Sequence, residues 1–178
     1  MDDQPPDSQW FEAEPAKMNV ISPEIVDMQQ SRLLPERKRI ALVAHDHKKK
    51  DLIDWARHNA VVLARHELLA TGTTGRLLEE ELDRPVTRLL SGPLGGDQQI
   101  GALIAEGKID MLIFFWDPME AQPHDSDVKA LLRLGVAWNI LLACDRATAD
   151  FLLTSPLMQE PYALALPDYE QYLKRRVE

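Results

Sequence analysis

The sequence is poor in the features that mark several classes of protein. It has a single cysteine, Cys144, which excludes a framework of internal disulfides. No apolar run approaches the roughly 20 residues that a membrane-spanning helix needs. The opening residues, MDDQPPDSQW, lack the basic and then apolar order of a secretory signal. We therefore expect a cytoplasmic protein with no membrane partner.

Positive charge is also scarce. The 20 basic and 29 acidic side chains give the 178 residues a formal net charge of −9. This charge opposes binding to nucleic acid, and the basic run from Lys48 to Lys50 is too short to override it. With 45% hydrophobic and 28% charged residues, the composition is that of one globular domain.

The first 36 residues differ in composition from the rest. They contain eight acidic and two basic residues, no glycine and five of the twelve prolines. Such a segment buries too little apolar surface to offset the entropy cost of ordering it. We therefore predict a mobile acidic extension over residues 1–36 and one globular domain over residues 37–178. A short amphipathic helix over residues 23–34 is the alternative for part of the extension.

Short apolar runs alternate with helical periods from Arg37 onward. The predicted strands cover residues 40–44, 67–70, 86–90, 111–116, 140–143 and 163–166. The predicted helices cover residues 49–65, 74–82, 97–106, 125–138, 147–153 and 168–177. Strands that are apolar on both faces and alternate with helices imply right-handed crossovers around a buried parallel sheet. The predicted fold class is α/β, a three-layer, doubly wound parallel sheet.

Polar loops follow the first four predicted strands directly. Ligands of parallel sheets bind at the carboxyl ends of the strands, which meet at one edge. The four loops are His45-Asp46-His47, residues 71–75 (TGTTG), residues 91–97 (SGPLGGD) and residues 117–127, which include Asp117, His124 and Asp127. We expect these loops to form one site.

Two of the loops are typical of phosphate-binding turns. TGTTG runs into a helix N-terminus, where free backbone N–H groups and the helix dipole favour an anion. SGPLGGD repeats the arrangement, and Lys49 can supply a counter-charge. Plain helix capping is the alternative for either turn alone, but two turns beside a lysine favour a bound phosphate. Neither turn has the spacing of a nucleotide triphosphate or dinucleotide motif.

Ionisable groups surround the predicted phosphate site. They are His45, Asp46, Asp97, Asp117, His124 and Asp127. A carboxylate near a bound phosphate ester can act as a general base, and a histidine can donate a hydrogen bond to a carbonyl oxygen that becomes an enolate. Capping is the alternative role of Asp97, and also of Asp125, because both stand near predicted helix starts. The sequence lacks the spacing of a zinc site and of a nucleophilic serine elbow. We expect metal-free acid–base chemistry on a phosphorylated metabolite.

At these residues the sequence resembles the methylglyoxal synthase family. The resemblance covers about residues 37–178 and lies in the strings IALVAHDHKKKDLIDWA, ATGTTG, LSGPLGGDQQIGALIAEGKIDMLIFFWDP, PHDSDVKALLRL, WNI, ATADF and PDYEQYL. It departs at Leu141 and Cys144-Asp145, where we expect a proline and a threonine- or cysteine-asparagine pair. The departure puts the packing near this strand end in question.

The resemblance implies a homohexameric lyase that converts dihydroxyacetone phosphate to methylglyoxal and inorganic phosphate without a cofactor. It makes Asp97 the catalytic base and adds His124 and Asp127 to the catalytic group. The implied substrate-binding residues are His45, Lys49, Thr71, Gly72, Thr73, Thr74, Ser91, Gly92 and His124, with Asp46 and Asp117 in support. Arg133 and Arg176 are either solvated surface charges or partners in ion pairs between subunits that carry phosphate-dependent cooperativity.

Two rival functions stay open. A regulatory domain that senses a small phosphate or a nucleotide would share the fold and the two anion-binding loops, but it could discard Asp97, His124 and Asp127. All three are present, which favours the enzyme. An isomerase that makes glyceraldehyde phosphate would share the enediol intermediate, so only the products distinguish it.

Overall fold

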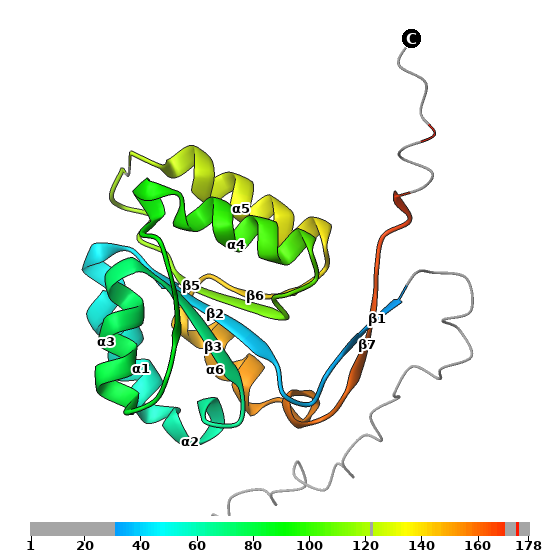
Figure 1. Ribbon diagram of the computed structural model, residues 1–178, viewed down its shortest axis with the longest axis horizontal. Helices are drawn as coiled ribbons and strands as arrows, with labels where there is room; N and C mark the ends of the chain where they lie inside the picture. The colour runs from blue at the N-terminus through cyan, green and yellow to red at the C-terminus, as the bar shows by residue number, and fades with distance from the viewer. Residues whose placement is uncertain (1–30, 122, 170–173, 175–178) are drawn as a thin grey trace, which may run out of the picture.

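The computed structural model of the protein describes residues 31–121, 123–169 and 174, and it contains the predicted parallel sheet (Figure 1). The strands are β2 (Arg39–Ala44), β3 (Glu67–Thr71), β4 (Thr87–Leu89), β5 (Met111–Phe115) and β6 (Leu141–Ala143). Their order in the sheet is β4-β3-β2-β5-β6. The chain adds β3 and β4 on one side of β2 and then returns to add β5 and β6 on the other. The topological switch therefore lies between β2 and β5, where a ligand crevice is expected.

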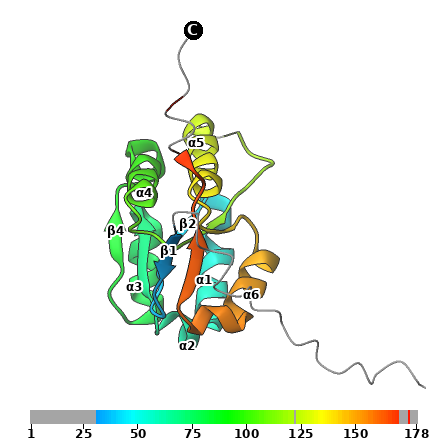
Figure 2. The ribbon, with the colours of Figure 1, turned by 90° about the vertical axis from the view of Figure 1, so that its right-hand side faces the viewer.

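Helices cover both faces of the sheet, which makes three layers (Figures 1 and 2). One face carries α1 (Lys49–His58), α2 (Ala60–Leu63), α3 (Gly72–Leu82) and α6 (Arg146–Thr154). The other face carries α4 (Gly96–Ala105) and α5 (Asp125–Ala137). The described residues also include three short 3-10 helices, η2 (Asp46–Lys48), η3 (Gly92–Leu94) and η4 (Pro156–Gln159).

The hydrophobic core is split in two by the sheet. Successive side chains of a strand point to opposite faces, so Leu42 of β2 packs in one cluster and Val43 in the other. The first cluster includes the fully buried Trp55 of α1, whose Nε1–H is satisfied by Asp150 of α6 at 2.7 Å. Because β5 is buried on both faces, all five of its residues are hydrophobic, which is the run seen in the sequence.

An antiparallel ribbon of two strands stands apart from the sheet (Figures 1 and 2). β1 (Ser31–Leu34) pairs with β7 (Tyr162–Ala165), and Ser31 faces Ala165. The fully buried Asp110 joins the ribbon to the sheet, because it pairs with Arg32 of β1 at 2.7 Å and with Arg39 of β2 at 2.8 Å. The ribbon is therefore held by charge as well as by strand pairing.

The ribbon corrects two predictions. The prediction of a mobile extension is wrong for residues 31–34, which form β1, and so is the alternative helix at these residues; residues 1–30 lie outside the described part. The predicted strand 163–166 forms at Tyr162–Ala165 but pairs with β1 and does not extend the parallel sheet. In both cases the partner lies about 130 residues away, so no local pattern could reveal it. Most of the predicted helix 168–177 is outside the described residues.

Smaller differences concern the ends of helices. The predicted helix 49–65 is divided at Asn59, whose φ of −99° and ψ of 13° end α1 before α2 begins. The helix predicted from residue 74 begins at Gly72. Neither Asp97 nor Asp125 is an N-cap, because Gly95 and His124 hold those positions and the two aspartates lie in the first turns of α4 and α5. No helix in the described ranges is long and apolar enough to cross a membrane.

Candidate active site

The polar loops meet around a cavity of about 90 Å³ at the carboxyl ends of the strands. The residues that line it are Val43, Ala44, His45, Asp46, Lys49, Thr71, Gly72, Thr73, Thr74, Ser91, Gly92, Pro93, Asp97, Phe114 and His124. All nine predicted substrate-binding residues are among them, together with Asp97 and Asp46. A volume of this size suits a small metabolite of few atoms.

The loop before α3 approaches the loop after β4 closely at Gly72. A Cβ at Gly72 would lie 2.9 Å from Cβ of Ser91, and its φ of +40° is one that other residues resist. Its N–H donates to the carbonyl of Leu90 at 3.2 Å, which joins the two loops. Thr71 holds the N-cap position of α3, but no side chain in the described part of the protein caps this helix. The first turn of α3 therefore faces the cavity with the positive end of its dipole.

Lys49 supplies the positive charge of the cavity. Its Nζ donates to Oδ1 of Asp46 at 2.5 Å and to Oγ1 of Thr73 at 2.7 Å. This hydrogen bond from Lys49 lowers the pKa of Asp46, so the carboxylate stays ionised and holds the ammonium in place. The lysine is thus fixed beside the helix terminus where an anion is favoured.

His45 has one ring nitrogen bonded and the other without a partner. Its Nδ1 accepts the backbone N–H of Asp117 at 3.2 Å, while its buried Nε2 has no hydrogen-bond partner in the described part of the protein. Burial, and to a lesser extent the nearby His124, lowers the pKa of His45. The ring is therefore neutral near pH 7 and has an unused donor or acceptor in the cavity. The rings of His45 and Phe114 form a T-shaped pair with centroids 5.0 Å apart.

Asp97 and His124 form a hydrogen-bonded pair. Oδ2 of Asp97 lies 2.7 Å from Nδ1 of His124, and Asp97 is only 2% exposed. Gly92 is required beside them, since a Cβ there would lie 2.8 Å from Cε1 of His124 and 3.2 Å from Oδ2 of Asp97. A buried carboxylate in the first turn of α4 and an imidazole beside it can exchange protons with a bound molecule.

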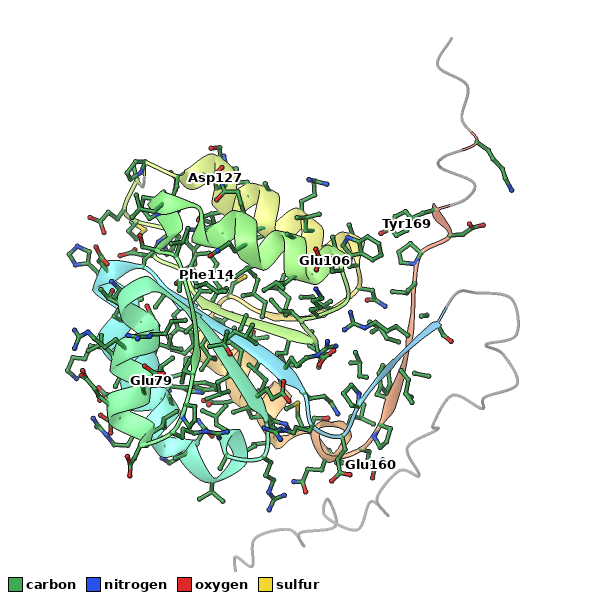
Figure 3. The ribbon with its side chains drawn as sticks, viewed as in Figure 1. Glu79, Glu106, Phe114, Asp127, Glu160 and Tyr169 are labelled. Atoms are coloured by element: carbon green, nitrogen blue, oxygen red, sulfur yellow. The ribbon has the colours of Figure 1, made fainter. Side chains whose placement is uncertain are left out.

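Asp117 and Asp127 are the predicted residues that the fold leaves outside the cavity lining. Asp117 holds His45 through its backbone, and its Oδ1 accepts the N–H of Met119 at 3.0 Å. Asp127 lies in the first turn of α5 (Figure 3). It lines a separate groove between α4 and α5, which it shares with Asp97. Asp127 is thus a neighbour of Asp97 in this groove and not a wall of the cavity.

Sequence reasoning missed the apolar wall of the cavity. Phe114 and Val43 belong to core strands, so their patterns indicate burial and not contact with a ligand. Their position at the carboxyl ends of their strands was the one sequence signal that could have placed them next to a ligand. Over the ranges that the structure describes, no three His, Cys, Asp or Glu side chains gather closely enough to hold a metal ion.

The remaining sequence-derived candidates lie away from the cavity. Arg133 is exposed on α5, and Arg176 lies outside the described residues. At the departure from the family pattern, Asp145 caps α6, since its carboxylate accepts the N–H of Thr148 at 2.9 Å. This bond lowers the pKa of Asp145. Asp145 therefore caps the helix as an asparagine could. Leu141, the other departure from the family pattern, packs against the hydrophobic core.

Fold and cavity together define an α/β domain with a small polar site at the carboxyl ends of its parallel strands. A family model for the MGS-like domain matches residues 51–144. Two proteins named methylglyoxal synthase, from Sodalis glossinidius and Pectobacterium atrosepticum, are 59% and 58% identical over 147 residues, which cover 83% of this chain and 96% and 97% of theirs. The crystal structure of methylglyoxal synthase from Elizabethkingia anophelis has a TM-score of 0.80 at 61% identity, over 84% of this chain and 99% of that chain. The chain belongs to the methylglyoxal synthase family, as its motifs predicted.

Proposed function

We propose that this chain converts dihydroxyacetone phosphate into methylglyoxal and inorganic phosphate. The observation that carries the proposal is the Asp97–His124 pair inside a cavity of phosphate-binding type. A base beside a bound phosphate ester can remove a carbon-bound proton to give an enediol phosphate. Phosphate is then eliminated if the enzyme holds the scissile C–O bond perpendicular to the enediol plane, which requires a rigid phosphate site.

The proposed roles follow from the position of each side chain. Asp97 is the base, while His45 and His124 bind the oxygen atoms of the three-carbon unit. The phosphate is bound by Lys49, Thr71, Gly72, Thr73, Thr74, Ser91 and Gly92. Asp46 positions Lys49, and Asp117 positions His45. Asp127 contributes negative charge near Asp97 from the groove between α4 and α5. Neither step transfers electrons to an acceptor, so the reaction needs no redox cofactor, and we propose that the side chains of the cavity catalyse it without a metal ion.

We also propose that the protein is a homo-oligomer, specifically a hexamer, in the cytoplasm. The groove between α4 and α5 has a volume of about 290 Å³ and is lined mainly by small and apolar side chains, among them Gly101, Ala102, Ala105 and Leu134. Uncovered apolar surface of this kind favours association. The net charge of −9 argues against a nucleic-acid or anionic-membrane partner. Light scattering after gel filtration measures the assembly.

One incubation tests the proposed reaction. The purified protein is given dihydroxyacetone phosphate, and free phosphate and methylglyoxal are assayed together. Equal amounts of both products are expected. Glyceraldehyde phosphate without free phosphate would identify an isomerase. Binding of phosphate with no turnover would identify a regulatory domain and overturn the proposal.

A further inference from the structure

The backbone N–H of Leu90 is bound by a side chain from α4. Leu90 follows the last residue of β4, which is at the edge of the sheet, and the pairing of β4 with β3 ends at Leu89 and Thr71. Oε1 of Gln99 accepts the N–H of Leu90 at 2.8 Å. Gln99 lies on α4 two residues after Asp97, so this hydrogen bond joins the loop after β4 to the helix that carries the proposed base.

The carbonyl group of Leu90 reaches the loop before α3. Its oxygen accepts the N–H of Gly72, the first residue of α3, at 3.2 Å. The same oxygen also lies against the start of α4, since a Cβ at Gly96 would be only 2.2 Å from it. The backbone of Leu90 therefore links the first turn of α3 to α4.

The loop that Leu90 begins is packed directly on Asp97. Gly92 lies two residues after Leu90, and a Cβ at this position would be 3.2 Å from Oδ2 of Asp97 and 2.8 Å from Cε1 of His124. Because there is so little free space, a displacement of Leu90 changes the distance between the proposed phosphate site and Asp97.

We infer that Gln99 is a positioning residue of the proposed reaction. By holding Leu90, it fixes residues 90–92 and the first turn of α3 relative to Asp97, so the bound phosphate ester lies where the base can reach its carbon atom. The inference rests on the proposed function and adds a residue that is outside the cavity lining. A misplacement of about 1 Å between reacting groups can cost about 100-fold in rate, so a single hydrogen bond can have a large effect.

The alternative role of Gln99 is only to satisfy the N–H of Leu90. Both residues are exposed, so water can replace the oxygen of Gln99 when the side chain is changed. Loss of the bond should therefore leave the protein folded but release the loop. The alternative role predicts a normal rate for the folded variant, whereas positioning predicts a slow one.

Kinetics of matched variants test the positioning role. Gln99→Met removes the acceptor and keeps the length of the side chain. We expect its kcat for methylglyoxal formation to fall by about 10- to 100-fold, while the Kd for inorganic phosphate changes by less than about threefold and the melting temperature is retained. Gln99→Glu should recover most of the rate, because a carboxylate oxygen can accept the same N–H. Gln98→Met is the control, since Gln98 is also exposed but does not bind Leu90.

Amide hydrogen exchange tests the two backbone hydrogen bonds. In Gln99→Met the N–H of Leu90 should exchange several-fold faster than in the wild-type protein. The N–H of Gly72 should also exchange faster, because its acceptor is the carbonyl of Leu90. Gln98→Met should leave both exchange rates unchanged. Wild-type protection of the Leu90 N–H in Gln99→Met would overturn the inference, because Gln99 would then not hold the loop.

A double-mutant cycle tests whether Gln99 acts through Asp97. Once Asp97→Asn has removed the base, there is no base left to position, so the addition of Gln99→Met should cause little further loss of rate. Fully additive losses would overturn the inference, and so would a wild-type kcat in Gln99→Met or a Gln99→Glu variant as slow as Gln99→Met.

The outcomes separate this inference from the proposed function. If the wild-type protein makes no methylglyoxal, the proposed function fails, and amide exchange at Leu90 and Gly72 still shows whether Gln99 holds the two loops together. If the wild-type protein is active and Gln99→Met is equally active, the positioning role is refuted while the proposed function stands.

Discussion

Nζ of Lys49 donates a hydrogen bond of 2.7 Å to Oγ1 of Thr73, which joins the start of α1 to the first turn of α3. The bond places the ammonium where two elements that are 24 residues apart enclose the cavity. The charge of Lys49 and the dipole of α3 therefore act on the same bound phosphate.

Lys49→Met should weaken the binding of inorganic phosphate by about 10- to 100-fold, because a hydrogen bond to a charged group contributes roughly 1.5–3 kcal/mol. Titration calorimetry with phosphate measures the change. Lys50→Met is the matched control, since Lys50 pairs with Asp54 on the exposed side of α1. Equal affinities in the two variants would show that Lys49 does not touch the phosphate.

Asp97→Asn should lower the rate of methylglyoxal formation by about 10²- to 10⁴-fold, because the amide cannot accept the carbon-bound proton. The amide of Asn can still form a hydrogen bond with Nδ1 of His124, so phosphate binding should be retained. Asp125→Asn, which removes a carboxylate outside the cavity, should stay near the wild-type rate. Solvent exchange at the wild-type rate in Asp97→Asn would make Asp127, its neighbour in the groove, the next candidate for the base.

Gly92→Ala should abolish most activity with little loss of stability. The added Cβ would lie 2.8 Å from Cε1 of His124, so the ring must move and its bond to Asp97 must lengthen. Gly135→Ala is the control, because the nearest contact of its Cβ is an ordinary 3.6 Å. Steady-state rates together with melting temperatures check both variants, and an active Gly92→Ala would contradict the geometry of the pair.

Removal of residues 1–30 should leave activity and melting temperature unchanged, whereas removal of residues 1–36 should lower the melting temperature by about 3–10 °C. The longer deletion removes β1 and with it Arg32, so the buried Asp110 keeps only Arg39 as an ion-pair partner. Calorimetry of both truncations and of full-length Arg32→Met makes the comparison. Identical melting curves would mean that the ribbon adds no stability.

Acid should destabilise the protein through His66. Burial comes first among the causes that lower the pKa of His66, followed by the nearby cations Lys38, Arg65, Arg84 and Arg37. As the pH falls, the imidazole therefore takes up a proton at a higher pH in the unfolded state than in the folded state. The free energy of unfolding has its full value above about pH 6.5 and decreases as the pH falls below it. The lowered pKa of His45 acts in the same direction.

His66→Asn should flatten this pH dependence between about pH 7 and pH 5. The asparagine oxygen can accept the backbone N–H of Lys38, which Nδ1 of His66 now accepts at 3.2 Å, but it does not titrate. Urea unfolding across this pH range measures the slope, with the exposed His58→Asn as control. An unchanged slope in His66→Asn would show that this histidine does not cause the acid sensitivity.

The parallel sheet and most of the cavity could be predicted from the sequence, because both depend on local patterns and one general rule. The apolar run of β5 indicated a strand buried on both faces, and the polar residues that follow β2, β3 and β4 had to meet at one sheet edge. Lys49, Thr73 and Asp97 were found in this way. The family motifs added their chemical roles.

Tertiary structure alone decided the features that depend on distant partners. β1 exists because β7 pairs with it, and the buried Asp110 finds both of its arginines only in the folded chain. From composition we predicted that residues 31–34 belong to a mobile extension. Strand pairing with a segment about 130 residues away leaves no local pattern in the sequence, so it could not be predicted. The hydrogen bonds of the two histidines are a further case: the spacing of His45 and His124 is visible in the sequence, but which nitrogen of each ring is engaged depends on Asp117 and Asp97 in three dimensions.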